Sequence, residues 1–188
     1  MLVDFIIPTY NRPALLKCML ASLVAQNNPD WGAHVVIDNP DDEENVKLVE
    51  SFNDSRIRWS KMDKRYNDWG HTPREYGKQQ SEAKYVIMTG DDNYYTPNFV
   101  SEIKHLCDVD AGMIYWDMVH SHYNYTYFRC VPGDGQIDMG AFATRTDLAK
   151  EIYLGVAYAA DGMFVETFKK KFPSQGIHKI DKVLFVHN

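Results

Sequence analysis

Three short polar segments of the sequence each follow an apolar run and carry side chains suited to binding chemistry. They are residues 9–12 (Thr-Tyr-Asn-Arg), residues 38–39 (Asp-Asn) and residues 91–93 (Asp-Asp-Asn). A carboxylate such as Asp38 could recognise a base, and a pair such as Asp91 and Asp92 could hold a divalent ion that neutralises a diphosphate. Asp and Asn are also common turn formers, so each segment taken alone could simply end a strand.

The apolar runs before these segments predict the elements that would position them. Residues 2–7, 34–37, 57–59 and 85–88 are typical of short buried strands. Helical spacing of apolar residues predicts helices over 15–24, 41–52 and 73–83, with a polar loop at 61–71. Alternating strands and helices favour a parallel, doubly wound sheet, in which the carboxyl ends of the strands meet at one edge. We therefore expect the three polar segments to converge.

The pattern changes after Gly112. Two aromatic-rich runs, 113–119 and 123–130, predict strands of a mixed or antiparallel region. Helices are expected over 147–153 and 161–171, and a last strand over 182–186. With 188 residues, 45% of them hydrophobic, the chain suits a single domain.

Composition argues against several classes of protein. The net charge of −6 disfavours a nucleic-acid binder, which usually carries a basic stripe. Three scattered cysteines predict neither a disulfide framework nor a zinc knuckle, and they indicate a reducing compartment. There is no apolar span of 18 residues and no cationic signal-peptide start, so no membrane span is expected and a cytoplasmic location is the default.

Three stretches, taken together, resemble a known family. They are IIPTYNRPALLKCMLASLVAQ, VIDN and REYGKQQSEAKYVIMTGDDN, and they look like the nucleotide-binding half of GT-A glycosyltransferases, especially family 2. The likeness covers residues 2–100 well and residues 136–188 more loosely. It implies an α/β GT-A fold, Rossmann-like, with a mostly parallel central sheet flanked by helices in a single compact domain. Residues 1–100 would form the nucleotide-sugar and metal half, and residues 101–188 the acceptor and catalytic-base half.

The resemblance also implies a donor site. Its nucleotide-binding positions correspond to Pro8, Thr9, Tyr10, Arg12, Asp38, Arg74 and Asp91. In the family, the carboxylate at the place of Asp38 pairs with a uracil-like edge, which suggests a uridine nucleotide. An Arg three residues before a Gly on a helix, as in Arg74 and Gly77, precedes the metal motif. Asp91 would approach the ribose or a metal-bound water, although Asp91 and Asn93 could also be turn residues.

The metal motif departs from the family pattern. The usual Asp-x-Asp is replaced here by Gly90-Asp91-Asp92, so the first carboxylate is absent and Asp92 should be the direct ligand. His187, after the apolar run 183–186, resembles a terminal His that completes the metal shell in some GT-A enzymes. Carboxylate, imidazole and diphosphate ligands fit Mn²⁺ or Mg²⁺. A structural or solvated histidine is the alternative for His187.

The acceptor half offers a candidate general base. Asp161 opens a helical pattern where family members place their base, and an ordinary helix N-cap is the alternative. Three weaker candidates for acceptor contacts are Trp116, Asp117 and Asp138. The aromatic run over 123–128 could stack an acceptor sugar or could simply form one face of a strand.

The sequence thus predicts a metal-dependent glycosyltransferase that moves a sugar from a nucleotide-sugar donor, a UDP-sugar, to a glycan or other hydroxyl acceptor with inversion. A retaining GT-A transferase uses the same donor half and remains an alternative. The altered motif at 90–92 also leaves open a non-catalytic nucleotide- or glycan-binding module. A nucleotidyltransferase fits less well, because residues 9–12 are not a Gly-rich phosphate loop.

Overall fold

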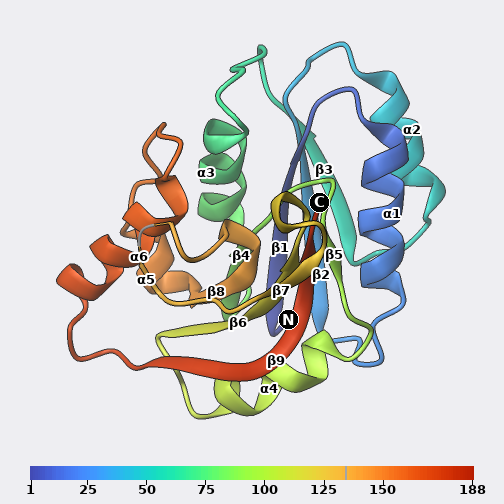
Figure 1. The fold of residues 1–188 in the computed structure, drawn as a ribbon. Helices are drawn as coiled ribbons and strands as arrows, with labels where there is room; N and C mark the ends of the chain where they lie inside the picture. Colours follow the sequence, from blue (N-terminus) through green and yellow to red (C-terminus); the bar gives the residue numbers. More distant parts are fainter. Residues whose placement is uncertain (134) are drawn as a thin grey trace.

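A single mixed β-sheet runs through the protein, and helices cover both of its faces (Figure 1). The computed structural model describes residues 1–133 and 135–188. Within these residues the strand order is β3-β2-β1-β4-β8-β6-β9-β5, and β7 pairs with β6 at the side of this path. The expected α/β architecture, a central sheet flanked by helices, is confirmed, and the sheet is parallel in its first half and mixed in its second.

The first half of the sheet is parallel throughout. Its strands are β1 (Val3–Thr9), β2 (Trp31–Ile37), β3 (Ile57–Lys61) and β4 (Tyr85–Met88). Every residue of β1, β2 and β4 is buried, as expected for strands covered on both faces. Helices α1 (Pro13–Val24) and α2 (Glu43–Ser51) lie on one face, and α3 (His71–Gln80) lies on the other (Figure 1).

The second half of the sheet is mixed. Strand β8 (Phe142–Arg145) pairs antiparallel with both β4 and β6 (Met113–His120). The long strand β9 (Ile177–His187) runs parallel to β6 and antiparallel to β5 (Tyr94–Tyr95). This arrangement brings the chain end at His187 beside the carboxyl end of β6, where His120 pairs with it in register.

Several element boundaries differ from the sequence predictions. The expected strand over 123–130 is a short 3₁₀ turn, η1 (Ser121–Tyr123), followed by β7 (Thr126–Phe128), because Asn124 and Tyr125 adopt left-handed backbone angles. Helix α5 (Thr146–Lys150) is shorter than expected, whereas β9 begins five residues earlier than the predicted strand over 182–186. Helix α4 (Phe99–Asp108), β5, β8 and the 3₁₀ turn η2 (Met139–Ala141) were not predicted.

A glycine sets how closely α3 packs on the sheet. Gly77 faces β1 and β2, and a Cβ at this position would collide with Ile6 and lie 3.1 Å from Val36 Cγ2. The absence of a side chain therefore lets the helix approach the strands closely. Arg74, one turn earlier, is carried by this close contact toward the carboxyl edge of the sheet.

Helices α4 and α6 (Ala160–Lys171) pack against the second half of the sheet. Helix α6 packs Phe164, Val165 and Phe168 into the core, and its Phe164 ring stacks on Phe142 of β8 at 5.8 Å. Helix α4 packs against β9. Among the described residues, no helix has both the length and the apolar character needed to cross a membrane.

Candidate functional site

The three polar segments meet at the carboxyl edge of the parallel strands and line one cavity. This donor cavity has a volume of about 410 Å³. Its lining residues are Pro8, Thr9, Tyr10, Arg12, Asp38, Arg65, Asn67, Asp68, Trp69, Gly70, Arg74, Gly90, Asp91, Asp92 and His187. All nine residues that the sequence assigned to nucleotide or metal therefore border the same space.

Asp91 is a buried carboxylate in the wall of the donor cavity. Its side chain is fully buried, and it accepts a hydrogen bond of 2.7 Å from the Thr9 hydroxyl. Arg12 Nη2 lies 2.7 Å from Asp91 Oδ1, and Arg12 Nη1 donates to Asp92 Oδ2 at 3.0 Å. Burial raises the pKa of Asp91, whereas the Thr9 hydroxyl and the Arg12 guanidinium oppose this shift. Arg12 thus bridges the two adjacent carboxylates.

Asp92 is the better placed of the two carboxylates for a metal ion. Its side chain is 26% exposed and shares the donor cavity with the His187 imidazole. In residues 1–133 and 135–188, no three His, Cys, Asp or Glu side chains converge as a closed metal cage. Mg²⁺ and similar ions commonly use one or two protein carboxylates and complete their shell with substrate phosphates and water. Asp92 and His187 are the oxygen and nitrogen donors that this cavity offers to such an open site.

Asp38 holds the loop that forms the opposite wall. Its two carboxylate oxygens accept hydrogen bonds from the backbone amides of Tyr66 (2.9 Å) and Asn67 (3.1 Å). The side chain is almost completely buried but still lines the cavity. Any contact with a base edge would therefore be made by a carboxylate that already fixes residues 62–70.

Residues 62–70 contribute cavity-lining side chains that the sequence analysis treated only as a polar loop. The Arg65 guanidinium lies 3.8 Å above the centre of the Tyr10 ring, a cation–π arrangement. Trp69 is 70% exposed and has a left-handed backbone, as does Gly70, where a Cβ would lie 2.8 Å from the Pro8 ring. No motif in the sequence pointed to this wall, because the course of an irregular loop depends on its tertiary contacts.

Arg74 links this loop to the carboxylate motif. Its Nε donates to the Thr89 carbonyl at 2.9 Å, and its Nη1 donates to the Trp69 carbonyl at 2.8 Å. Thr89 lies between the end of β4 and the Gly90-Asp91-Asp92 motif. Arg74 therefore organises the backbone on both sides of the cavity, in addition to lining it.

A second cavity, of about 450 Å³, adjoins the first. Its lining residues are Trp69, His71, Arg74, Met118, His120, His122, Tyr123, Phe128, Gly135, Ile137, Asp138, Met139, Tyr158, Ala159, Ala160, Asp161 and His187. Trp69, Arg74 and His187 line both cavities. Each of these three side chains thus borders both spaces, which lie next to each other. We call the second space the acceptor cavity, after the acceptor site that the sequence analysis expects in this half of the chain.

Two of the predicted acceptor-side carboxylates lie in this second cavity. Asp161 is partly buried in the first turn of α6, where Ala159 and not Asp161 is the N-cap residue. Asp138 caps η2 through the Gly140 amide at 2.8 Å, and its Oδ2 lies 3.7 Å from His187 Nε2. The helix N-terminus favours a negative charge on Asp161.

A cluster of three histidines, His120, His122 and His187, forms another wall of the acceptor cavity. The rings of His120 and His187 stack at 4.2 Å, and that of His122 lies 5.5 Å from His187. Burial, reinforced by the positive charges that His187 and His122 would carry, lowers the pKa of His120 to about 4. His120 is therefore neutral near pH 7.

Trp116 and Asp117 were expected near the acceptor, and the structure corrects this expectation. Trp116 is fully buried and packs edge-on against Phe99 at 4.7 Å. Asp117 is also buried, where it accepts a 2.8 Å hydrogen bond from the Cys130 amide and pairs with Lys179 at 3.0 Å. Both face the packing between β6 and its neighbours and line neither cavity.

Sequence comparison assigns the chain to a family. The profile described as "Glycosyl transferase family 2" matches residues 4–131, which include the donor cavity up to Asp92. The chain belongs to glycosyl transferase family 2. No curated protein matches it in sequence.

Solved glycosyltransferase structures share the fold of this family 2 chain. S. aureus TarS 1–349 superposes with a TM-score of 0.80 at 20% identity, covering 100% of this chain and 60% of TarS 1–349. Its complex with UDP-GlcNAc gives 0.78 at 19% identity, with coverages of 99% and 58%. Mannosyltransferase PcManGT from Pyrobaculum calidifontis, in complex with GDP-Man and Mn²⁺, gives 0.76 at 16% identity, with coverages of 98% and 56%. The chain thus spans about 60% of the length of TarS 1–349.

Proposed function

We propose that this family 2 protein transfers a sugar from a UDP-sugar to a hydroxyl of a glycan, using Mn²⁺ or Mg²⁺ and inverting the anomeric configuration. The observation that carries this proposal is that the two cavities are adjacent and share Trp69, Arg74 and His187 as lining residues. One contains the carboxylate motif and the loop expected to hold a nucleotide, and the other contains Asp161. A sugar held where they meet would face a group able to accept a proton.

The donor side of the proposal rests on the wall formed by Asp38, residues 62–70 and Tyr10. This wall offers an aromatic ring, backbone groups and a cationic side chain for a nucleoside. The S. aureus TarS structures in complex with UDP and with UDP-GlcNAc have the same fold and favour a uridine nucleotide. The GDP-Man complex of PcManGT supplies the alternative donor to test.

Asp92 and His187 would hold the divalent ion. When bound, this ion would neutralise the charge that the diphosphate develops as it leaves. The Mn²⁺ in the PcManGT complex supports this use of a metal in the same fold. Arg74, which lines both cavities, adds a fixed positive charge beside the place where they meet.

Asp161 would remove the proton from the acceptor hydroxyl as that oxygen attacks the anomeric carbon. The oxygen–carbon bond forms while the bond to the diphosphate breaks, so single displacement inverts the configuration. Asp161 is the carboxylate that the first turn of α6 presents to the acceptor cavity. The retaining alternative differs in the anomeric configuration of the product.

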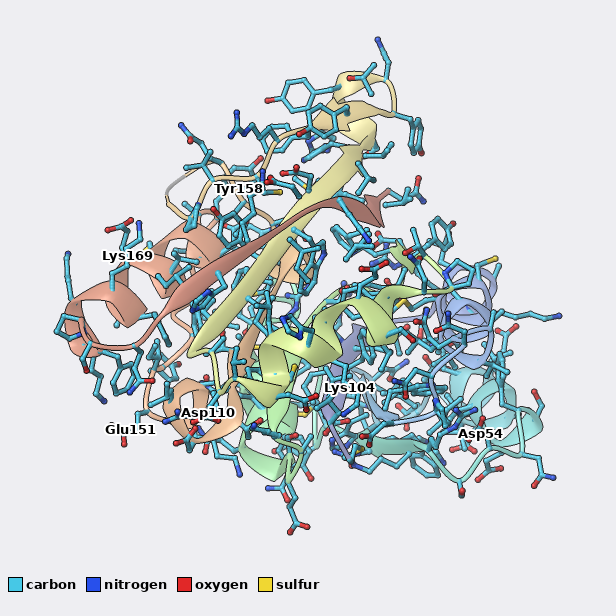
Figure 2. The ribbon with its side chains drawn as sticks, turned by 90° about the horizontal axis from the view of Figure 1, so that it is seen from below. Asp54, Lys104, Asp110, Glu151, Tyr158 and Lys169 are labelled. Carbon is cyan, nitrogen blue, oxygen red and sulfur yellow. The ribbon has the colours of Figure 1, made fainter. Side chains whose placement is uncertain are left out.

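The rim of the acceptor cavity supports the proposal of a carbohydrate acceptor. Trp69, Tyr123 and Tyr158 come from three separate segments, line this cavity and expose 70%, 55% and 89% of their surface. Tyr158 lies on the side of the molecule that carries the β6–β7 hairpin, away from Asp110 (Figure 2). Exposed aromatic rings with a polar edge suit the mixed apolar and hydroxyl surface of a sugar.

The proposal is tested by thermal shift and by product analysis. A ligand that binds only the native state raises the melting temperature. We expect a UDP-sugar to stabilise the protein more in Mn²⁺ than in chelator, and Asp92→Asn to lose the difference. Equal stabilisation in chelator would remove the metal from the proposal, and no response to any UDP- or GDP-sugar would remove the donor site.

A further inference from the structure

Arg12 already pairs with the carboxylates of Asp91 and Asp92, beside which the proposed metal would bind. Its guanidinium group lies within 4 Å of both Asp91 and Asp92, and it contacts the two carboxylates through different nitrogens. We propose that Arg12 is an internal counter-cation that competes with the divalent ion for these carboxylates, and that the nucleotide diphosphate draws it away. This inference rests on the proposed donor site and adds to it a coupling between nucleotide and metal.

The need for a counter-cation follows from burial. Asp91 has no exposed surface, and Asp92 follows it directly in the chain. Two neighbouring carboxylates repel each other, and a buried charge is costly unless it is paired. Besides Arg12, Asp91 receives the Thr9 hydroxyl, which carries no charge. Arg12 therefore supplies positive charge to this pair in the metal-free protein.

The same contacts hinder a metal. Asp92 Oδ2 accepts the hydrogen bond from Arg12 Nη1, so this oxygen is shared between the guanidinium and any incoming ion. A charge-assisted bond of this kind is among the stronger polar contacts in proteins. An ion that binds Asp92 must weaken it or displace it.

Arg12 is placed so that it can leave. Its side chain is 49% exposed, and its residue is the N-cap of α1 without a side-chain capping bond. It already lines the donor cavity, where a diphosphate would offer the paired oxygens that a guanidinium binds well. If the Arg12 guanidinium moved from the carboxylates to the diphosphate, it would exchange one anionic partner for another, and its own burial would change little.

This exchange makes two binding events favour each other. If the nucleotide removes Arg12 from Asp92, it raises the affinity for the metal, and the metal must raise the affinity for the nucleotide by the same factor. Part of any such coupling comes from direct contact between ion and diphosphate. The part due to Arg12 is the one that a substitution at this residue removes.

The test is an isothermal titration with MnCl₂ in the absence of nucleotide, comparing the wild-type chain, Arg12→Gln and Arg65→Gln. Arg65 lines the same cavity but stacks on Tyr10, so Arg65→Gln removes an equal charge without touching the carboxylates. We expect Arg12→Gln to bind Mn²⁺ about three- to tenfold more tightly than both other proteins. Equal Mn²⁺ affinity in all three, equal gains in both variants, or weaker binding by Arg12→Gln would overturn the proposal.

Two further measurements keep the result interpretable. Arg12→Lys retains the charge but cannot reach both carboxylates with one planar group, so its Mn²⁺ affinity should lie between those of the wild type and Arg12→Gln. The titration repeated with saturating UDP should show a smaller gain from nucleotide in Arg12→Gln than in the wild type, and an unchanged gain would count against the exchange. Failure of UDP to bind would reject the proposed donor site, whereas the nucleotide-free titration would still decide the competition.

Discussion

At the scale of single residues, a substitution at Asp161 can distinguish a structural role at the helix N-terminus from a catalytic role. It lies one residue inside α6, past the N-cap at Ala159, and its Oδ1 accepts the amide of Gly162 at 2.8 Å. A carboxylate in a first helical turn also gains from the helix dipole by roughly 0.3–1 kcal/mol. These two interactions contribute little to stability and an asparagine can keep the first, so a large loss of activity in a folded Asp161→Asn protein would point to chemistry.

We predict that Asp161→Asn retains donor affinity and melting temperature but loses turnover. An amide keeps the shape of the side chain but cannot take the acceptor proton, and a positioned base contributes about 10²- to 10⁴-fold. Transfer rates from a discontinuous assay with UDP-sugar and acceptor measure the change. Glu166→Gln is the matched control, because Glu166 lies on the same helix, pairs with Lys169 and lines neither cavity. Transfer by Asp161→Asn within a few-fold of the wild type would assign the base elsewhere, with Asp138 the next carboxylate to test.

At the scale of elements, the segment between α5 and α6 depends on a buried ion pair in α3. Lys78 is fully buried, pairs with Glu75 at 2.7 Å and donates to the Ile152 carbonyl. Glu75 also accepts the Leu154 amide at 3.0 Å. These contacts fix the start of the segment that carries Tyr158 and leads into Asp161, so α3 positions one wall of the acceptor cavity.

We predict that Lys78→Met destabilises the protein by about 3–5 kcal/mol, because it leaves Glu75 partly buried without its cation. The Michaelis constant for the acceptor should rise while that for the donor changes little, since the donor cavity does not include residues 151–159. Urea unfolding and steady-state kinetics measure the two effects. Replacing both partners, Glu75→Gln with Lys78→Met, should recover part of the stability. If the Michaelis constant for the donor rose as much as that for the acceptor, this result would contradict the role of α3 in positioning the acceptor cavity.

At the scale of the whole molecule, the sequence predicted the half of the fold in which local pattern and tertiary structure agree. The strands before residues 9, 38 and 91 are continuous apolar runs, and a parallel sheet must bring their ends together. The second half depends on distant pairing. Strand β5 has only two residues, and β8 includes Thr144 and Arg145 among its four, so neither is a continuous apolar run. Both gain their hydrogen bonds from distant strands, β9, β4 and β6.

The candidate site likewise contains residues that the sequence located correctly and residues that it did not. Residues in the motifs, such as Asp38, Asp91 and Asp92, were placed correctly at one cavity, since chain spacing and strand ends determine them. Trp116 was expected to contact the acceptor, but it lies on β6, a central strand of the sheet, where its side chain is fully buried. Trp69 and Tyr158 belong to irregular segments whose course depends on tertiary contacts, so no sequence motif predicts that they line a cavity.

The stability of the whole protein should fall in mild acid, and a buried histidine in β2 should contribute part of this fall. His34 lies in β2 with its Nε2 2.9 Å from the Ser60 hydroxyl, and burial, together with Arg58, lowers its pKa to about 4. The folded state thus disfavours protonation that the unfolded chain accepts below about pH 6.5. This part of the stability is complete above pH 6.5 and is lost as the pH falls toward 4.

We predict a loss of about 2 kcal/mol in unfolding free energy from this histidine between pH 7 and pH 5. Urea unfolding at a series of pH values measures it. His34→Gln keeps a polar group near Ser60 but does not titrate, so its stability should decline less over the same range. Parallel curves for the two proteins would show that other groups cause the acid sensitivity.

The site depends on Gly77, although this residue has no side chain that could take part in the chemistry. Alanine favours a helix over glycine by roughly 1 kcal/mol, so helix propensity alone would reward the exchange. The side chain of Ile6 leaves no room for the added methyl group, and α3 would have to lift from the sheet and take Arg74 with it. Among functional variants of this protein, a position far from any reacting atom should therefore tolerate as little substitution as the carboxylates do.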